Sequence, residues 1–140
     1  MKYIPFVISD QAREYCMNYV SNNTADNTYN GSGLSEFYPK DNKFKTNFDY
    51  RYVCLGLMTD GNVVDHIDID RDSVLIVPLS PITIRQNGKQ TTSDAFVLDT
   101  TITHGAEASN GHVFIAFDFT DTYDNVTKLF ENIEMISIDV

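Results

Sequence analysis

Hydrophobic positions near both ends of the chain recur three and four residues apart, which is the spacing of one helical face. In the first segment this apolar set comprises Ala12, Tyr15, Cys16, Tyr19 and Val20. The pattern predicts a helix over about residues 10–22, with Ser9 or Asp10 as its N-cap. In the last segment the set comprises Tyr123, Val126, Leu129, Phe130 and Ile133. A second helix is therefore predicted after Thr120 or Asp121, followed by a final strand over residues 135–140.

Between the two helices, alternating or continuous apolar runs predict strands. The predicted strands cover residues 2–8, 48–58, 63–69, 73–79, 82–84, 95–103 and 112–119. The second half of the 48–58 run is apolar at every position, so we expect it to be buried on both faces.

Three turns are expected to join these strands into antiparallel pairs. The residues Asp60-Gly61 suit a tight hairpin turn between 48–58 and 63–69, and Asn87-Gly88 suit another after 82–84. A longer loop over 105–111 is expected to join 95–103 to 112–119. These elements predict an α+β, β-rich fold, a mostly antiparallel sandwich-like or curled sheet with an N-terminal and a C-terminal amphipathic helix.

The chain of 140 residues has the usual length of one domain, so we expect a single domain over 1–140. Within it, residues 24–47 form the longest segment without a clear period, and such segments often make contacts. This stretch interleaves aromatic and basic side chains, and we predict that it is a partner-binding arm. Its candidate contact residues are Tyr29, Phe37, Tyr38, Lys40, Lys43 and Phe44.

Acidic residues outnumber basic ones by 20 to 10, and residues 101–140 carry seven acidic side chains against one basic. Nucleic acids are bound through Lys and Arg, so this balance disfavours direct nucleic-acid binding. It favours a basic or neutral protein surface as partner, and we predict that Glu107, Asp121 and Asp124 take part in such contacts. No apolar run is long enough for a signal peptide or a membrane span, so a cytoplasmic location is expected, in the host cytoplasm or an assembled particle if the protein is viral.

Two groups of residues have side chains that bind metals. On a strand, His66, Asp68, Asp70 and Asp72 would share one face, a geometry that suits Ca²⁺ or Mg²⁺, although a solvated strand face explains the same pattern. His104 and His112 flank a loop that contains Glu107, and this trio could hold a transition metal. Neither group has the spacing of a known site, so the sequence predicts no metal, no cofactor and no catalytic residue.

No glycine-rich phosphate loop and no nucleophile motif is present, and Cys16 lies on the apolar face of the first predicted helix. We therefore predict a protein that is not an enzyme. The composition favours a structural or assembly protein that docks on other subunits or on itself, such as an accessory capsid subunit of a phage or virus particle. The alternative is an acidic inhibitor or immunity-type protein that blocks a basic nucleic-acid-binding surface.

Overall fold

The protein is strand-dominated. A computed structural model describes residues 2–29, 31–41, 44–86 and 88–140. Strands make up 44% of the described residues and helices 15%, in three mostly antiparallel sheets. The predicted α+β class with two amphipathic helices is therefore wrong, because the two helices are short and cover sheets that supply most of the core.

The helices are α1 (Asp10–Asn22) and α2 (Tyr123–Leu129). The strands are β1 (Tyr3–Ile4), β2 (Phe6–Ile8), β3 (Asn27–Tyr29), β4 (Leu34–Phe37), β5 (Lys45–Thr46), β6 (Tyr52–Met58), β7 (Asn62–His66), β8 (Ser73–Pro78), β9 (Ile82–Arg85), β10 (Lys89–Thr92), β11 (Ala95–Asp99), β12 (His104–Glu107), β13 (Val113–Asp118) and β14 (Ile136–Asp139).

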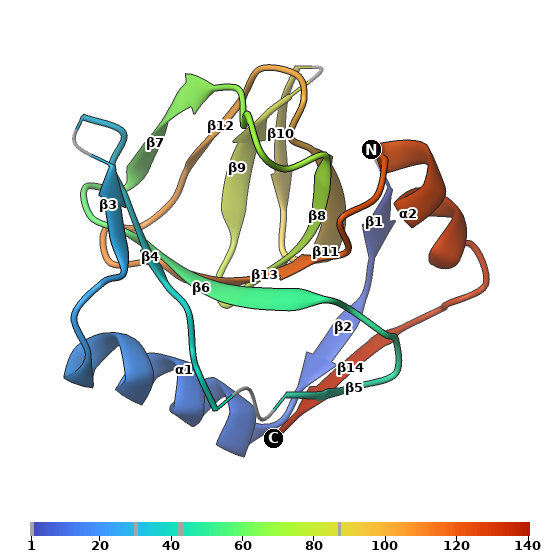
Figure 1. Cartoon of the computed structure of the whole chain (residues 1–140), viewed down its shortest axis with the longest axis horizontal. Coiled ribbons are helices and arrows are strands. Elements are labelled where there is room, and N and C mark those ends of the chain that lie inside the picture. The colour runs from blue at the N-terminus through green and yellow to red at the C-terminus, as the bar shows by residue number, and fades with distance from the viewer. Residues whose placement is uncertain (1, 30, 42–43, 87) are drawn as a thin grey trace.

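A seven-stranded sheet in the order β1-β11-β8-β13-β6-β4-β3 forms the middle layer of the molecule (Figure 1). Successive side chains of a strand point to opposite faces, so its central strands contribute to two separate cores. In β6, Cys54 and Met58 belong to one core, whereas Val53 and Leu55 belong to the other. This confirms the expectation that the second half of the 48–58 run is buried on both sides.

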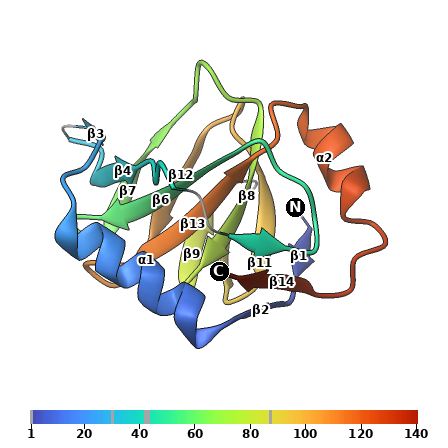
Figure 2. The same ribbon diagram turned by 60° about the horizontal axis from the view of Figure 1, so that its bottom comes forward.

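One face of this sheet is covered by the four-stranded sheet β10-β9-β12-β7. The opposite face is covered by α1, α2 and the small sheet β2-β14-β5, and Figure 2 shows α1 and β2 lying across it. The large sheet and the four-stranded sheet therefore face each other, and the space between them is lined mainly by their inward side chains.

Two of the three expected hairpins are wrong in their pairing. The turn at Gly61 forms with φ 77°, but β7 pairs with β12 in the other sheet, because both edges of β6 are taken by β4 and β13. Likewise β11 and β13 do not pair with each other, since β8 lies between them. The segment 105–111 expected to be their loop contains the last three residues of β12. The third hairpin, β9 with β10, is confirmed, although Asn87 itself lies outside the described residues.

The predicted helix ends agree with the structure more closely than the predicted strand pairing does. The α1 helix has the predicted bounds, and the Ser9 hydroxyl accepts a hydrogen bond from the Ala12 amide at 3.0 Å. The N-cap of α2 is Thr122, one residue later than predicted. Pro5 divides the predicted first strand into β1 and β2, which join different sheets. Neither α1 nor α2, the helices of the described residues, has the length or apolar content of a membrane-spanning helix.

The segment 24–47 contains β3, β4 and β5. The strands β3 and β4 extend the large sheet by pairing outward from β6, and β5 pairs with β14 in the small sheet. Much of this stretch is thus tied to sheets by backbone hydrogen bonds.

Candidate functional site

Two histidines face each other across the β7–β12 pair in the four-stranded sheet. His66 and His104 are directly opposed in register, and their ring centroids lie 4.2 Å apart. Between His104 and Ala106 the register shifts by one residue, because two residues of β7 oppose Gly105 alone. Such bulges redirect side chains next to them, and here the shifted register brings the two imidazoles together.

Asp68 completes this cluster. It lies two residues beyond His66, and its Oδ1 atom is 3.2 Å from His66 Nε2 and 3.3 Å from His104 Nε2. The ligand atoms of the three side chains all lie within 4.8 Å of one another. The cluster therefore joins one side chain from each of β7, β12 and the loop that follows β7.

The backbone fixes which nitrogen of each imidazole faces Asp68. His66 Nδ1 is 2.6 Å from the Val64 carbonyl oxygen, and His104 Nδ1 is 2.8 Å from the Ile102 carbonyl oxygen. A carbonyl oxygen only accepts, so each Nδ1 carries the proton and donates it. In a neutral imidazole the Nε2 atom then presents a lone pair toward the Asp68 carboxylate.

With both imidazoles neutral, three electron-pair donors converge on one point, and a positive charge there, either a proton on Nε2 or a metal ion, stabilises them. Hydrogen bonding to Asp68 raises the pKa of His66 despite its burial. Burial raises the pKa of Asp68, but hydrogen bonds from His104 and His66 outweigh it, and the pKa lies well below the usual value. Asp68 is therefore a carboxylate at neutral pH, as metal binding requires.

The donor set fits a divalent transition metal. With bonds of about 2.1 Å, the ligands of one metal lie about 3–4 Å apart, and the contacts of 3.2 and 3.3 Å to Asp68 Oδ1 match this spacing. Histidines that bind metals generally donate the other ring N–H to a carbonyl or carboxylate, as both do here. Two imidazoles and one carboxylate also leave positions free on the metal for another ligand.

The cluster lies in the wall of a cavity of about 630 Å³ between the two facing sheets. Its lining consists largely of aliphatic and aromatic side chains from both sheets, among them Leu34, Ile76, Ile84, Phe96 and Phe114. Small-molecule sites have this volume and this mixture of an apolar lining with few polar groups. The arrangement can therefore hold a metal and a small molecule side by side.

A buried ionic network lies in the wall of the same cavity and is built on Glu36, which is 6% exposed. Arg71 donates from Nη1 to Glu36 Oε2 at 3.3 Å, and from Nη2 to the Tyr38 hydroxyl at 3.0 Å. The hydroxyls of Tyr29 and Tyr38 both donate to Glu36 Oε1 at 3.0 Å. Burial and the nearby Glu36 charge raise the pKa of both phenols to about 12, so they stay protonated donors.

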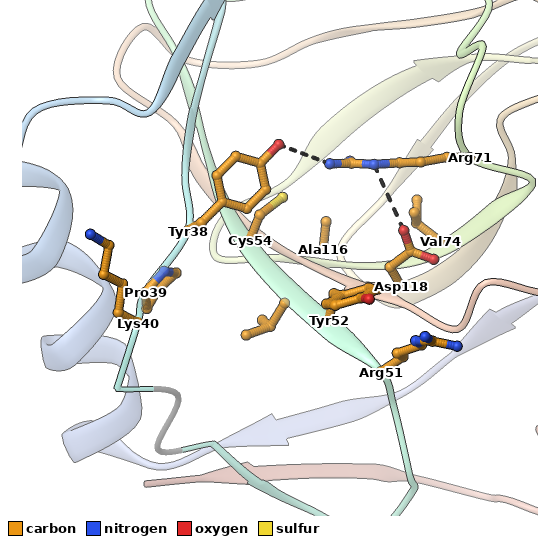
Figure 3. Close-up of a pocket in the computed structure, with 11 residues that line it drawn as sticks. Tyr38, Pro39, Lys40, Arg51, Tyr52, Cys54, Arg71, Val74, Ala116 and Asp118 are labelled. Carbon is orange, nitrogen blue, oxygen red and sulfur yellow. Dashed lines mark hydrogen bonds and ion pairs between the residues drawn. The ribbon is translucent and has the colours of Figure 1, made fainter.

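Arg71 also borders a second cavity of about 440 Å³ on the same face of the large sheet. Figure 3 shows its guanidinium above Cys54 and Ala116, held by Tyr38 on one side and Asp118 on the other. Lys40 and Arg51 also line this cavity, but in the figure their charged ends point away from Arg71 and from each other. The basic groups therefore do not converge on a common point.

The residues predicted to bind a partner are spread over the molecule. Phe37 and Phe44 are buried in the core, and Tyr29 and Tyr38 belong to the Glu36 network. Lys40 is exposed, and Lys43 lies outside the described residues. Glu107 bridges Arg85 and Lys89 on the four-stranded sheet, whereas Asp121 and Asp124 lie at the start of α2. Their proposed partner contacts stay a prediction.

The sequence pointed to every member of the cluster but divided them between two groups. His66 and Asp68 belonged to the acidic strand pattern, and His104 to the loop predicted to end at His112. In the structure His112 instead contacts Ser80 at 2.6 Å, and Glu107 binds Arg85. The pairing of β7 with β12 joins the two groups, and this pairing was missed because a hairpin between the strands now seen as β6 and β7 was predicted instead.

No family model matches the sequence, and no curated protein matches it. Among solved structures, the chain is similar to KdgF from Halomonas sp., with 14% identity over 75% of this chain and 94% of that one, at a TM-score of 0.51. It is also similar to an RmlC-like cupin from Shewanella frigidimarina, with 14% identity over 76% and 92% of the two chains, at a TM-score of 0.49.

These comparisons correct the functional prediction. The predicted capsid accessory or virion subunit is wrong, because the fold is similar to that of KdgF and encloses a cavity with a donor cluster. The acidic-inhibitor alternative is not retained for the same reason. The prediction that the chain is not an enzyme finds no support. The likeness to KdgF shows a shared fold, in which two antiparallel sheets face each other around a cavity.

Proposed function

We propose that this protein is a metal-dependent enzyme that acts on a small molecule, with His66, Asp68 and His104 as the metal ligands. The observation that carries the proposal is the convergence of three electron-pair donors at 3.2 and 3.3 Å, with both Nδ1 atoms bound to backbone carbonyls. Such a cluster is stabilised by a cation, and its position in the cavity wall places that cation beside the space for a ligand.

When bound, a divalent metal with this ligand set acts as a Lewis acid or as a site for oxygen chemistry. The protein's own residues have separate tasks. The Val64 and Ile102 carbonyls hold the imidazoles in one tautomer. The apolar lining excludes water from the ligand, and Tyr29 and Tyr38 keep Glu36 in a fixed position in the cavity wall.

Metal titration tests the proposal. Metal-free protein should bind one Zn²⁺ or Co²⁺ per chain by calorimetry, and Co²⁺ should give a visible absorption band typical of nitrogen and oxygen ligands. His104→Ala and Asp68→Asn should each weaken binding at least about 100-fold, since the first removes a direct ligand and the second replaces an anionic ligand by a neutral amide. The matched control is His112→Ala, because His112 is the third histidine of the chain and lies outside the cluster.

Equal metal affinity in the wild type and in the Asp68→Asn and His104→Ala variants would refute the metal site. A loss of affinity that is equally large in His112→Ala would also refute it, because the effect would then follow from general destabilisation. Circular dichroism of all variants establishes that the fold is retained.

A further inference from the structure

The charges around the large cavity determine which ligands it accepts. Three carboxylates line it, those of Glu36, Asp68 and Asp70, against one guanidinium, that of Arg71. With the two histidines neutral, the lining therefore carries a net charge of two negative units. A divalent cation on the cluster would balance this charge and leave no positive surplus for an anionic ligand.

The guanidinium of Arg71 already has partners within the protein. Arg71 is the one arginine or lysine among the described residues that line the cavity. Its Nη1 faces Glu36, its Nη2 faces Tyr38, and its Nε lies 3.8 Å from an Asp118 carboxylate oxygen. An anionic ligand would have to displace Glu36 or Asp118 and leave a carboxylate without its cation, which is costly in a buried place.

The phenol hydroxyls of the cavity lining also already donate hydrogen bonds within the protein. Tyr29 and Tyr38 each donate their single O–H to Glu36 Oε1. The remaining surface of the cavity is largely aliphatic and aromatic, with Val63, Ile82 and Ile84 from the four-stranded sheet facing Ile76 and Phe114 from the large sheet. Such a lining binds apolar surface and provides few partners for the many hydroxyls of a highly polar ligand.

We infer that the cavity takes an uncharged, mainly apolar small molecule that presents one oxygen or nitrogen lone pair to the His66–Asp68–His104 cluster. The orientation of this lone pair rests on the proposed metal site, whereas the charge and polarity of the ligand rest on the lining alone. A volume of about 630 Å³ accommodates a ligand of two or three fused rings.

Two probes of equal shape and different charge test this ligand class: 2-naphthamide, which is neutral, and 2-naphthoate, which is an anion at pH 7. The chain has no tryptophan, so naphthalene fluorescence is measured without tryptophan emission. We expect 2-naphthamide to bind metal-free protein at least about 10-fold more tightly than 2-naphthoate, because in this lining the carboxylate would lose its hydration without gaining a cation.

A pair of alanine variants localises the binding. Ala106 is half-buried on β12 and lines the cavity, and Ala106→Leu should weaken 2-naphthamide binding at least about 5-fold by filling that space. Ala25 is half-buried against the core on the opposite face of the large sheet, so Ala25→Leu should leave binding unchanged. If Ala106→Leu fails to fold, Leu34→Ala in the cavity lining removes apolar contact and should also weaken binding of the probe.

The inference is overturned if 2-naphthoate binds as tightly as the amide, if neither probe binds, or if the two alanine variants change binding equally. The probes are compared on metal-free protein, so their discrimination is measured independently of Co²⁺ binding. Loss of metal binding with intact discrimination between the probes would therefore refute the metal proposal alone. Metal binding without discrimination would refute the ligand class alone.

Discussion

Replacement of Arg71 by methionine tests whether this arginine is a structural counter-ion of Glu36. Methionine has a similar length and no charge, so Arg71→Met removes the guanidinium while filling much of its space. The side chains of Arg71 and Glu36 are only 20% and 9% exposed, and their atoms lie 3.3 Å apart. The variant therefore leaves a carboxylate buried without its cation.

Breaking a buried ion pair from one side costs about 3–5 kcal/mol. Here Glu36 keeps two phenol donors, from Tyr29 and Tyr38, and these compensate part of the loss. The expected decrease in the free energy of unfolding is thus at the lower end, about 3 kcal/mol. In a domain of this size it corresponds to a decrease in Tm of about 10 °C.

The assay is urea-induced unfolding at pH 7 of the wild type, Arg71→Met, Glu36→Gln and the double variant. The double variant should recover at least half of the stability lost in Arg71→Met, because the buried charge disappears together with its partner. A decrease below about 1 kcal/mol in Arg71→Met would refute the reasoning. Additive losses in the double variant would refute it as well.

Three further predictions concern the bulge, a buried histidine and a helix cap. Gly105→Ala should lower stability by about 1–3 kcal/mol and weaken metal binding, because a Cβ atom there would lie 2.3 Å from Asp65 Oδ1; unchanged Co²⁺ affinity would contradict this. Burial lowers the pKa of His112, so the unfolded state binds more protons than the folded state at acidic pH. The contribution of His112 to stability therefore falls as pH drops below about 6.5. The stability advantage of the wild type over His112→Gln should shrink between pH 7.5 and 5, and a constant difference would argue against this. Ser9→Ala should cost about 1 kcal/mol in urea unfolding by removing the cap on the Ala12 amide, whereas a change below about 0.3 kcal/mol would mean that water replaces it.

The sequence by itself determined the features that depend on neighbouring residues. The spacing of apolar residues and the cap at Ser9 defined α1, since helix periodicity and capping act within a few residues. The alternation along β13, the turn at Gly61 and the β9–β10 hairpin are local in the same sense. The strong acidity was also evident, but it gave the wrong function, because net charge describes the surface and says little about an interior cavity.

Only the tertiary structure decided which strands pair. Strands adjacent in sequence favour hairpins, but both edges of β6 pair with β4 and β13. The next strand, β7, therefore lies in the other sheet and pairs with β12. This long-range choice brought His104 opposite His66 and within 3.3 Å of Asp68. The side chains of the site were visible in the sequence as separate candidates. Their convergence depends on sheet register and on a bulge at Gly105, and both arise from packing among distant segments rather than from any local pattern.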